Sequence, residues 1–331
     1  MTKPSTKNNF DILRLILAVL VFFAHWNILT QQNLSNPLFH LSGYAVSIFF
    51  IVSGFLIFWS FDNDQNKKHF YTKRFFRIFP LYMALILFQT LFFVIVTDGN
   101  FGALVKYFVS NILFLNFLAP SVGNTLSHLQ VDAINGSLWT LKNEVIFYAL
   151  VPLIFALYKK WGIYFLVLLY CLSVAFMFTV NDIGSSKLLS QFPAQLRLFV
   201  TGIILYVLFH KFNSLKILVT LPFAFSLLFF LNDNVYFGFA FSPMLLGLIV
   251  LTLTFYLRYV HINFDFSYSF YILHFPIIQL SLYFGINPDN PWMSFISLFS
   301  IIFIMSYFSE RYIEKQFIRI GKNIIRKNKD D

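Results

Sequence analysis

Ten separate stretches of this chain are apolar, and each is long enough to cross a lipid bilayer. They occupy residues 12–30, 38–60, 79–97, 137–157, 161–180, 193–210, 215–231, 236–257, 266–285 and 292–309. A helix that crosses a bilayer needs about 20 mostly apolar residues and forms its backbone hydrogen bonds internally. With 58% hydrophobic and 11% charged residues, the composition excludes a soluble globular domain and a disordered chain. The sequence predicts an all-α, polytopic membrane protein with about ten transmembrane helices.

Basic residues are concentrated in every second connection between these stretches. They lie at the N-terminus, in 61–78, at 159–160, at 211–216, at Arg258 and in the tail after residue 309. Apart from Arg14 in the first stretch, the remaining positions hold only Lys106, Lys142, Lys187 and Arg197. Because cytoplasmic loops of membrane proteins carry the excess of Lys and Arg, we expect both termini in the cytoplasm. The same bias explains the net charge of +10, which gives no support to nucleic-acid binding.

Three further features limit the domain organisation and the kinds of site. Residues 103–119 are apolar but interrupted by one lysine and two asparagines, which suits an interfacial or re-entrant helix better than a full crossing. The single cysteine, Cys171, allows neither an intrachain disulfide nor a thiolate metal site, and we predict no bound metal. No hydrophilic insert is long enough for a second domain. We therefore expect 1–331 to form one membrane domain with a short basic cytoplasmic tail.

The first apolar stretch contains two ionisable residues, Arg14 and His25. Charge at bilayer depth costs at least about 2.5–3.5 kcal/mol, so such residues usually have a function. Arg14 and His25 are eleven residues apart, so they share one helical face about 16 Å apart along the axis. With the N-terminus inside, Arg14 lies near the cytoplasmic rim and His25 in the outer half. The structural alternatives are an arginine that snorkels to the membrane surface and a histidine satisfied in the core.

Glu144 is an acidic residue that lies well inside a predicted span. By the helical rise per residue it lies roughly 10 Å below the outer surface, and His25 lies roughly 8 Å below it. A carboxylate that holds an imidazole in one tautomer is a usual way to prepare a neutral histidine as a general base. We therefore predict that His25 and Glu144 are a catalytic pair. An ion pair that only fixes helix packing is the alternative.

Two arginines, Arg74 and Arg77, precede the third predicted span on its cytoplasmic side. Their spacing of three places them on one helical face. Pro80 follows, as suits the first turn of a helix. Paired guanidinium groups at this position could clamp a phosphate in bidentate fashion. Charge that only sets the topology is the alternative.

Several other polar residues could support a site. Tyr271 and His274 lie three residues apart in 266–285, and Ser53 stands beside Gly54, where helices or a ligand could approach closely. Arg197 lies near the outer end of its span without an evident acidic partner, so it could contact an anionic or polyhydroxyl acceptor.

Taken in order, these motifs resemble acyltransferase family 3, the integral-membrane acyltransferases that O-acetylate bacterial surface polysaccharides. The resemblance covers essentially the whole chain. It rests on Arg14-x10-His25, Phe49-Phe50-x-x-Ser53-Gly54-Phe55, Arg74-x-x-Arg77 before Pro80, Ser137-Leu138-Trp139-Thr140-Leu141-x-x-Glu144-x-x-Phe147-Tyr148, and Ser267-Tyr268 through His274-x-Pro276.

The resemblance implies an enzyme of the bacterial inner membrane that takes an acyl group, usually acetyl, from cytoplasmic acyl-CoA. It would deliver this group to a hydroxyl of a surface polysaccharide, or of its lipid-linked precursor, on the outer side. Membrane lipid, acyl-CoA and the glycan are the expected partners, and the protein could form a homo-oligomer. Many family members carry an extra C-terminal esterase-like domain, which we expect to be absent here.

The resemblance also assigns roles to residues. It implies that Arg14, Arg74 and Arg77 bind the acyl-CoA donor, and that His25 is catalytic, with Glu144. Supporting or substrate-binding roles are then predicted for Ser53, Trp139, Tyr148, Tyr271, His274 and Arg197.

Two chemical routes and two other functions stay open at the level of sequence. His25 could act as a general base for direct transfer, or it could carry the acyl group itself. Intramembrane His, Glu and Arg also suit a proton-coupled transporter, although no internal repeat of hydropathy is visible. An acyltransferase that acts on a lipid or a small molecule is the other alternative.

Overall fold

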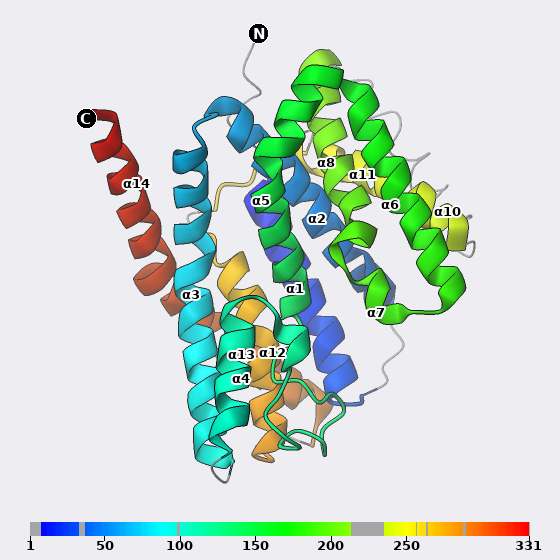
Figure 1. Cartoon of the computed structure of the whole chain (residues 1–331). Helices are drawn as coiled ribbons and strands as arrows, with labels where there is room; N and C mark the ends of the chain where they lie inside the picture. The colour runs from blue at the N-terminus through cyan, green and yellow to red at the C-terminus, as the bar shows by residue number, and fades with distance from the viewer. Residues whose placement is uncertain are drawn as a thin grey trace. The chain divides into compact units, whose positions relative to one another are not determined.

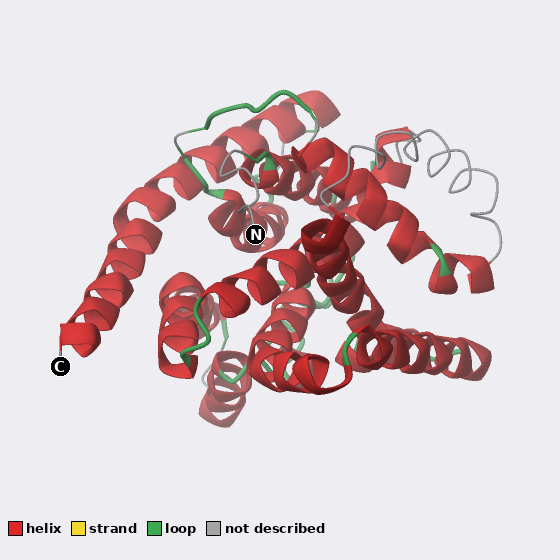
Figure 2. Cartoon of the chain, turned by 90° about the horizontal axis from the view of Figure 1, so that it is seen from above, coloured by secondary structure: helices red, strands yellow, loops and turns green. Residues whose placement is uncertain are grey.

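The computed structural model describes residues 8–32, 37–97, 100–212, 235–255, 257–262, 264–286 and 289–330. Regular structure in these ranges is helical, without a strand (Figure 2). Within the described ranges, seven helices are long and apolar enough to cross a membrane: Phe10–Leu29, Leu41–Asn63, Lys67–Val96, Leu138–Trp161, Ile163–Ile183, Lys187–Lys211 and Pro291–Lys327. The predicted all-α class is thereby confirmed, and the long apolar helices are those of a multi-pass membrane protein.

The chain divides into two compact units, which are described separately. Residues 1–17, 44–70 and 143–263 belong to unit 1, and residues 18–43, 71–142 and 264–331 to unit 2. The helices labelled in Figure 1 that run through parts of both are α1 (Phe10–Leu29), α2 (Pro37–Asn63), α3 (Lys67–Val96) and α5 (Leu138–Trp161). Unit 1 also contains α6 (Ile163–Ile183), α7 (Ser186–Leu189), α8 (Phe192–Phe212), α10 (Val235–Ala240) and α11 (Ser242–Phe255). Unit 2 also contains α4 (Phe101–Ile112), η1 (Asn116–Leu118), α12 (Ser267–Tyr283), α13 (Pro291–Ser309), η2 (Glu310–Glu314) and α14 (Lys315–Asp330).

Some predicted spans differ from the helices observed. The span 215–231 lies outside the described residues, and 236–257 is divided between α10 and α11. The stretch 103–119 is not a crossing helix, in agreement with the prediction, because α4 has only 12 residues and a loop follows it. The tail after α13, which was expected only to be basic, forms the helix α14.

The predicted position of Pro80 in the first turn of a helix is wrong. Helix α3 begins at Lys67, and Pro80 lies inside it. The side chain of Asn66 accepts a hydrogen bond of 3.2 Å from the backbone N–H of His69. This is the contact of an N-cap residue, so the helix starts well before the apolar part of the span. Arg74 and Arg77 therefore lie within α3, on one face of it as predicted.

In unit 1, helices α2 and α8 touch at the backbone. A methyl group added at Gly54 would lie 2.1 Å from the carbonyl oxygen of Phe199, and one at Gly202 would lie 2.1 Å from that of Ile51. Glycine is therefore required on both sides of this crossing, as in the close helix pairs of membrane proteins. The ring of Phe199 packs between Phe50 and Phe147, with centroids 4.7 and 4.4 Å away. This contact holds the helix that carries Ser53.

In unit 2, a long loop after α4 is attached to α12. Gln279 donates to the carbonyl oxygens of Val131 and Ala133, at 2.7 Å each, and Asn135 donates to that of Ile272 at 3.0 Å. A buried hydrophobic cluster joins the loop to α3 and α4. It comprises Phe92, Phe93, Tyr107, Ala119, Val122, Leu126 and Ile134. The hydrogen bonds satisfy two carbonyl groups of the loop and one of α12. They also fix the position of α12, which carries His274.

Candidate active site

Two histidines from opposite ends of the chain meet in unit 2. Nδ1 of His25, on α1, lies 2.7 Å from Nε2 of His274, on α12, and the two rings are nearly parallel. His274 has no exposed surface, whereas His25 is half-buried. The next residue of α1, Trp26, donates from its indole N–H to Ser294 of α13 at 3.2 Å. The three helices therefore hold His25 at a defined position.

The contacts of His274 determine the tautomer of a neutral pair. Nδ1 of His274 lies 3.3 Å from the carbonyl oxygen of Phe270, which can only accept a hydrogen bond. The hydrogen of a neutral His274 is therefore on Nδ1, and its Nε2 accepts. His25 must then donate from Nδ1, which leaves the lone pair of His25 on Nε2. A neutral imidazole in this tautomer is suited to remove a proton from a hydroxyl group.

The first turn of α5 is tied to α12 beside this pair. Thr140 and Tyr271 share a hydrogen bond of 2.8 Å between their hydroxyl groups, and the ring centroid of Tyr271 lies 5.7 Å from that of His274. Ser137 donates to the side chain of Asn135 at 2.6 Å. Trp139 lines a small cavity of about 130 Å³ together with Asn135 and residues of the loop. Tyr271, His274 and Trp139, all predicted as supporting residues, thus belong to unit 2 with His25.

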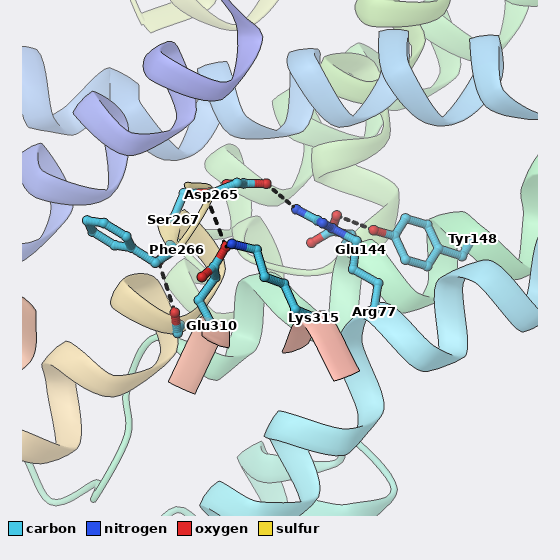
Figure 3. A network of polar contacts seen from close by, with 9 residues as sticks. Arg77, Glu144, Tyr148, Asp265, Phe266, Ser267, Glu310 and Lys315 are labelled. Carbon is cyan, nitrogen blue, oxygen red and sulfur yellow. Dashed lines mark hydrogen bonds and ion pairs between the residues drawn. The ribbon is translucent and has the colours of Figure 1, made fainter. Parts of the chain in front are cut away.

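In unit 1, Glu144 is held by two hydroxyl groups. Ser53 of α2 donates to Oε1 of Glu144 at 3.2 Å. Tyr148, one helical turn along α5, donates to the same oxygen, and Figure 3 shows Tyr148 beside Glu144. Three residues that the sequence singled out separately therefore form one cluster. The recorded partner of His25 Nδ1 is His274, and Glu144 belongs to the other unit. The pairing of His25 with Glu144 stays a prediction.

An ion pair connects Arg77 of α3 with Asp265, two residues before α12 (Figure 3). Nη2 of Arg77 lies 2.7 Å from Oδ2 of Asp265, whose other oxygen accepts from Ser267 at 2.6 Å. Close by, Lys315 is 2.8 Å from the buried carboxylate of Glu310 in the π-helical turn η2. Sequence reasoning missed Asp265, because the only signal for it is its place two residues before the Ser267-Tyr268 motif.

The other predicted cations have different surroundings. Arg14 and Arg74 are half-buried. Arg197 is buried, its guanidinium donates to the carbonyl oxygens of Ala194 at 2.5 Å and Phe239 at 3.2 Å, and it lies over the Phe239 ring. These contacts join α8 to α10. A contact between Arg197 and an acceptor stays a prediction.

An apolar cavity of about 560 Å³ lies between α3, α12 and α13 in unit 2. Leu273, Pro276 and Ile277 line it from α12, on both sides of His274 in the sequence. Phe88 lines it from α3, and Tyr312 lines it from η2. Its lining suits hydrocarbon better than a sugar. Across the described residues, no three His, Cys, Asp or Glu side chains are grouped so that they could hold a metal ion.

Several known proteins are similar to this chain in sequence. The O-acetyl transferase of Shigella phage Sf6 is 28% identical over 94% of this chain and 96% of its own length. Nodulation protein 10 of Rhizobium leguminosarum bv. viciae is 31% identical over 47% of this chain, and the match spans only 46% of that relative's length. The acyltransferase MdmB of Streptomyces mycarofaciens is 27% identical over 45% of this chain and 39% of its own. No solved structure matches the chain.

The family model described as an acyltransferase domain matches residues 7–311, which include both histidines, the Glu144 cluster and Arg77. The chain therefore belongs to acyltransferase family 3 and is a membrane-bound O-acyltransferase.

Proposed function

We propose that this enzyme transfers an acyl group, most simply acetyl, from cytoplasmic acyl-CoA to a hydroxyl of a surface polysaccharide or its lipid-linked precursor. The acceptor would lie on the outer side of the bacterial inner membrane. Family membership and the full-length similarity to a phage O-acetyl transferase support the acyl transfer. The intramembrane charges also suited a proton-coupled transporter, but family membership favours the enzyme.

The observation that carries this proposal is the hydrogen-bonded pair of His25 and His274. His25 is the general base, because its Nε2 lone pair is left free when Nδ1 donates to His274. His274 is a positioning residue that holds His25 in this tautomer. A carboxylate that oriented His25 would have to bind Nε2, because Nδ1 already donates to His274. Nε2 is the nitrogen that must take the proton in the reaction. The orienting role that the sequence suggested for Glu144 thus passes to His274 in this proposal.

The reaction then follows from the chemistry of a thioester. His25 Nε2 takes the proton of the acceptor hydroxyl while the oxygen attacks the thioester carbonyl carbon. The C–S bond breaks, coenzyme A leaves as a thiolate, and the proton on His25 passes to the sulfur. The products are an O-acyl ester and free coenzyme A. A positioned general base of this kind contributes about 10²- to 10⁴-fold to the rate.

The donor is bound by Arg74 and Arg77, and Arg14 is a further donor-binding residue that the resemblance implies. Guanidinium groups bind phosphates in bidentate fashion, and coenzyme A carries several phosphates. Asp265 accepts a hydrogen bond from Nη2 of Arg77, and an arginine side chain has five N–H donors. A phosphate could therefore bind beside the ion pair without displacing it.

The apolar cavity favours an acceptor with a hydrocarbon chain over a free polysaccharide. A lipid-linked glycan could place its chain between α3, α12 and α13, where the lining is nearly all apolar. A lipid acceptor without a glycan fits the same cavity and is the second candidate. Acceptor competition separates the two: a polyprenyl-linked glycan should be acylated in preference to a polyprenyl lipid that carries no sugar, and the reverse preference would favour the lipid acceptor.

A labelled-donor assay tests the proposed activity. Purified protein in nanodiscs receives acetyl-CoA labelled in the acetyl group, with and without lipid-linked glycan. Wild-type protein should hydrolyse the donor slowly and transfer label to the glycan, and His25→Ala should reduce transfer at least about 100-fold. Cys171→Ser, at an exposed position on α6, serves as the control. A folded wild-type protein that neither hydrolyses nor transfers would contradict the proposal.

A further inference from the structure

The last helix, α14, presents two different ridges to its surroundings. Phe317, Ile320 and Ile324 recur at helical spacing and are 37%, 45% and 39% exposed. At 100° per residue, Ile320 and Ile324 lie within about 60° of Phe317 around the helix. Arg319, Lys322 and Arg326 lie about 140° to 200° away from Phe317, on the opposite side. We call these the apolar ridge and the basic ridge.

A third side of α14 packs against the protein. Gly321 lies so close to the ring of Phe76 in α3 that a methyl group at this position would be 2.9 Å from it. Ile325 is buried on the same side, and Figure 1 shows α14 running beside α3. The orientation of the helix in unit 2 is therefore fixed by its packing. The basic ridge remains exposed, and so does a part of each side chain of the apolar ridge.

The basic ridge also lacks acidic neighbours. Residues 315–327 contain five basic residues and no acidic residue. Lys315 pairs with Glu310, but within the described ranges no ion pair involves Arg319, Lys322 or Arg326. All three side chains are exposed. An uncompensated positive ridge on an otherwise packed helix favours an anionic partner.

The length of the helix locates α14 relative to a bilayer. The continuous helix Pro291–Lys327 has 37 residues, or about 55 Å at 1.5 Å per residue, whereas the hydrocarbon core is about 30 Å thick. The 19 residues of α13 suffice to cross it. The π-helical turn η2 separates α13 from α14, and helices bend at turns of this kind, so α14 need not continue along the direction of α13. On this geometry α14 begins where α13 leaves the hydrocarbon, at the level of the lipid headgroups. An exposed apolar ridge at that level is stabilised by burial at the edge of the acyl chains.

We propose that α14 is an amphipathic interfacial helix that binds anionic phospholipid in the leaflet where α13 ends. The apolar ridge enters the boundary between headgroups and acyl chains, and the basic ridge contacts lipid phosphates. A protein partner would need acidic groups to match the basic ridge and would exclude the lipid from the apolar one. The position of α14 at the membrane surface favours the lipid, which is always present there.

Depth measurements on the full-length protein test this inference. A spin label is attached at Ile324→Cys, on the apolar ridge, or at Asn323→Cys, on a polar side, each in a Cys171→Ser background. The protein is placed in nanodiscs of phosphatidylcholine alone or with phosphatidylglycerol. With phosphatidylglycerol, the label at 324 should be accessible to oxygen and protected from a water-soluble nickel reagent, and the label at 323 should not be protected.

Removal of the basic ridge is the critical comparison. Arg319→Gln, Lys322→Gln and Arg326→Gln combined leave Gly321 and Ile325 in place, so the packing on α3 is retained. The fraction of phosphatidylglycerol needed for half-maximal protection should rise by at least about fivefold, the effect of one basic residue near an anionic surface. The matched control Lys67→Gln with Lys68→Gln removes exposed charge from α3 and should leave protection unchanged.

Three outcomes would overturn the inference. One is a label at 324 that is equally accessible to nickel in both lipids, and another is protection that survives loss of the basic ridge. The third is protection in phosphatidylcholine discs that appears only when acetyl-CoA or a soluble protein is added, because the ridge would then bind that partner. None of these results depends on the acyltransferase activity.

Discussion

At the scale of single residues, the account depends on two side chains that lie 249 positions apart in the sequence. Each was recognisable alone, His25 as an intramembrane imidazole and His274 as part of an aromatic motif. Their pairing was not predictable, because a contact between two helices depends on the packing of the whole unit. The carbonyl of Phe270 adds the hydrogen bond that leaves Nε2 of His25 as the nitrogen that would act as the base.

Removal of the second histidine should affect turnover without affecting substrate binding. In His274→Ala, His25 loses the acceptor for Nδ1–H and populates both tautomers, so kcat should fall by about 10- to 100-fold, part of the general-base contribution. KM for acyl-CoA should be unchanged, since His274 has no exposed surface. Steady-state kinetics of the reconstituted enzyme measure both.

Two variants make this prediction specific. His274→Gln offers a carboxamide oxygen to His25 Nδ1 and should recover part of the lost kcat. His128→Ala removes an exposed histidine of the same unit and should behave as wild type. Equal losses in His274→Ala and His274→Gln, with lowered thermal stability in both, would instead indicate a packing role.

Glu144 can be tested with almost no change of shape. Ser53 and Tyr148 both donate to Oε1, and a glutamine keeps a carbonyl oxygen there. Glu144→Gln should therefore keep the thermal unfolding temperature of the wild type. If the negative charge of Glu144 takes part in catalysis, kcat should fall by at least about tenfold. Wild-type kcat in Glu144→Gln, together with a destabilised Glu144→Ala, would assign Glu144 to packing.

At the scale of helices, patterns long enough to be periodic were predicted well. The apolar run 292–309 is the helix Pro291–Ser309, and the interrupted run at 103–119 is too short a helix to cross. The start points of helices are harder to predict. Pro80 suggests that α3 begins near it, whereas the N-cap contact of Asn66 places the start at Lys67. The tail has apolar residues at helical spacing as well as basic residues, and the basic residues alone do not predict the helix α14.

The crossing of α2 and α8 should tolerate no side chain larger than hydrogen. Gly54→Ala would place a methyl group against the backbone of α8, so the helices must separate, at a cost of about 1–3 kcal/mol or more in the free energy of unfolding. Thermal unfolding in detergent measures the loss. Gly43→Ala, in the same helix with no atom within 4 Å, is the matched control and should be neutral or slightly stabilising. Equal stability of the two variants would exclude the close contact.

The donor residues on α3 should affect binding more than turnover. Loss of a charge-assisted hydrogen bond to phosphate costs about 1.5–3 kcal/mol, so Arg77→Ala should raise KM for acetyl-CoA about 10- to 100-fold with a smaller change in kcat. Lys68→Ala, exposed on the same helix, is the control. Asp265→Asn removes the ion pair but keeps the arginine. If it raised KM as much as Arg77→Ala, the arginine would act only through its contact with Asp265.

At the scale of the whole molecule, composition alone led to the all-α membrane class, because so low a charge content leaves few other folds. The basic loops predict cytoplasmic termini, and that orientation stays a prediction. The motifs led to the family, which the match over residues 7–311 confirms. What composition and motifs could not supply was the set of contacts around the site. Ser53 with Glu144, and Arg77 with Asp265, are pairs of residues from distant parts of the chain.

The central claim, that His25 is the base of an O-acyl transfer to a surface glycan, is tested most directly by NMR of the surface polysaccharide. Cells lacking the gene are complemented with wild type, His25→Ala or His128→Ala, each quantified in the membrane. The account predicts an acyl ester signal with wild type and His128→Ala and none with His25→Ala. An ester signal at the wild-type level in cells with a normal amount of the His25→Ala protein would contradict it.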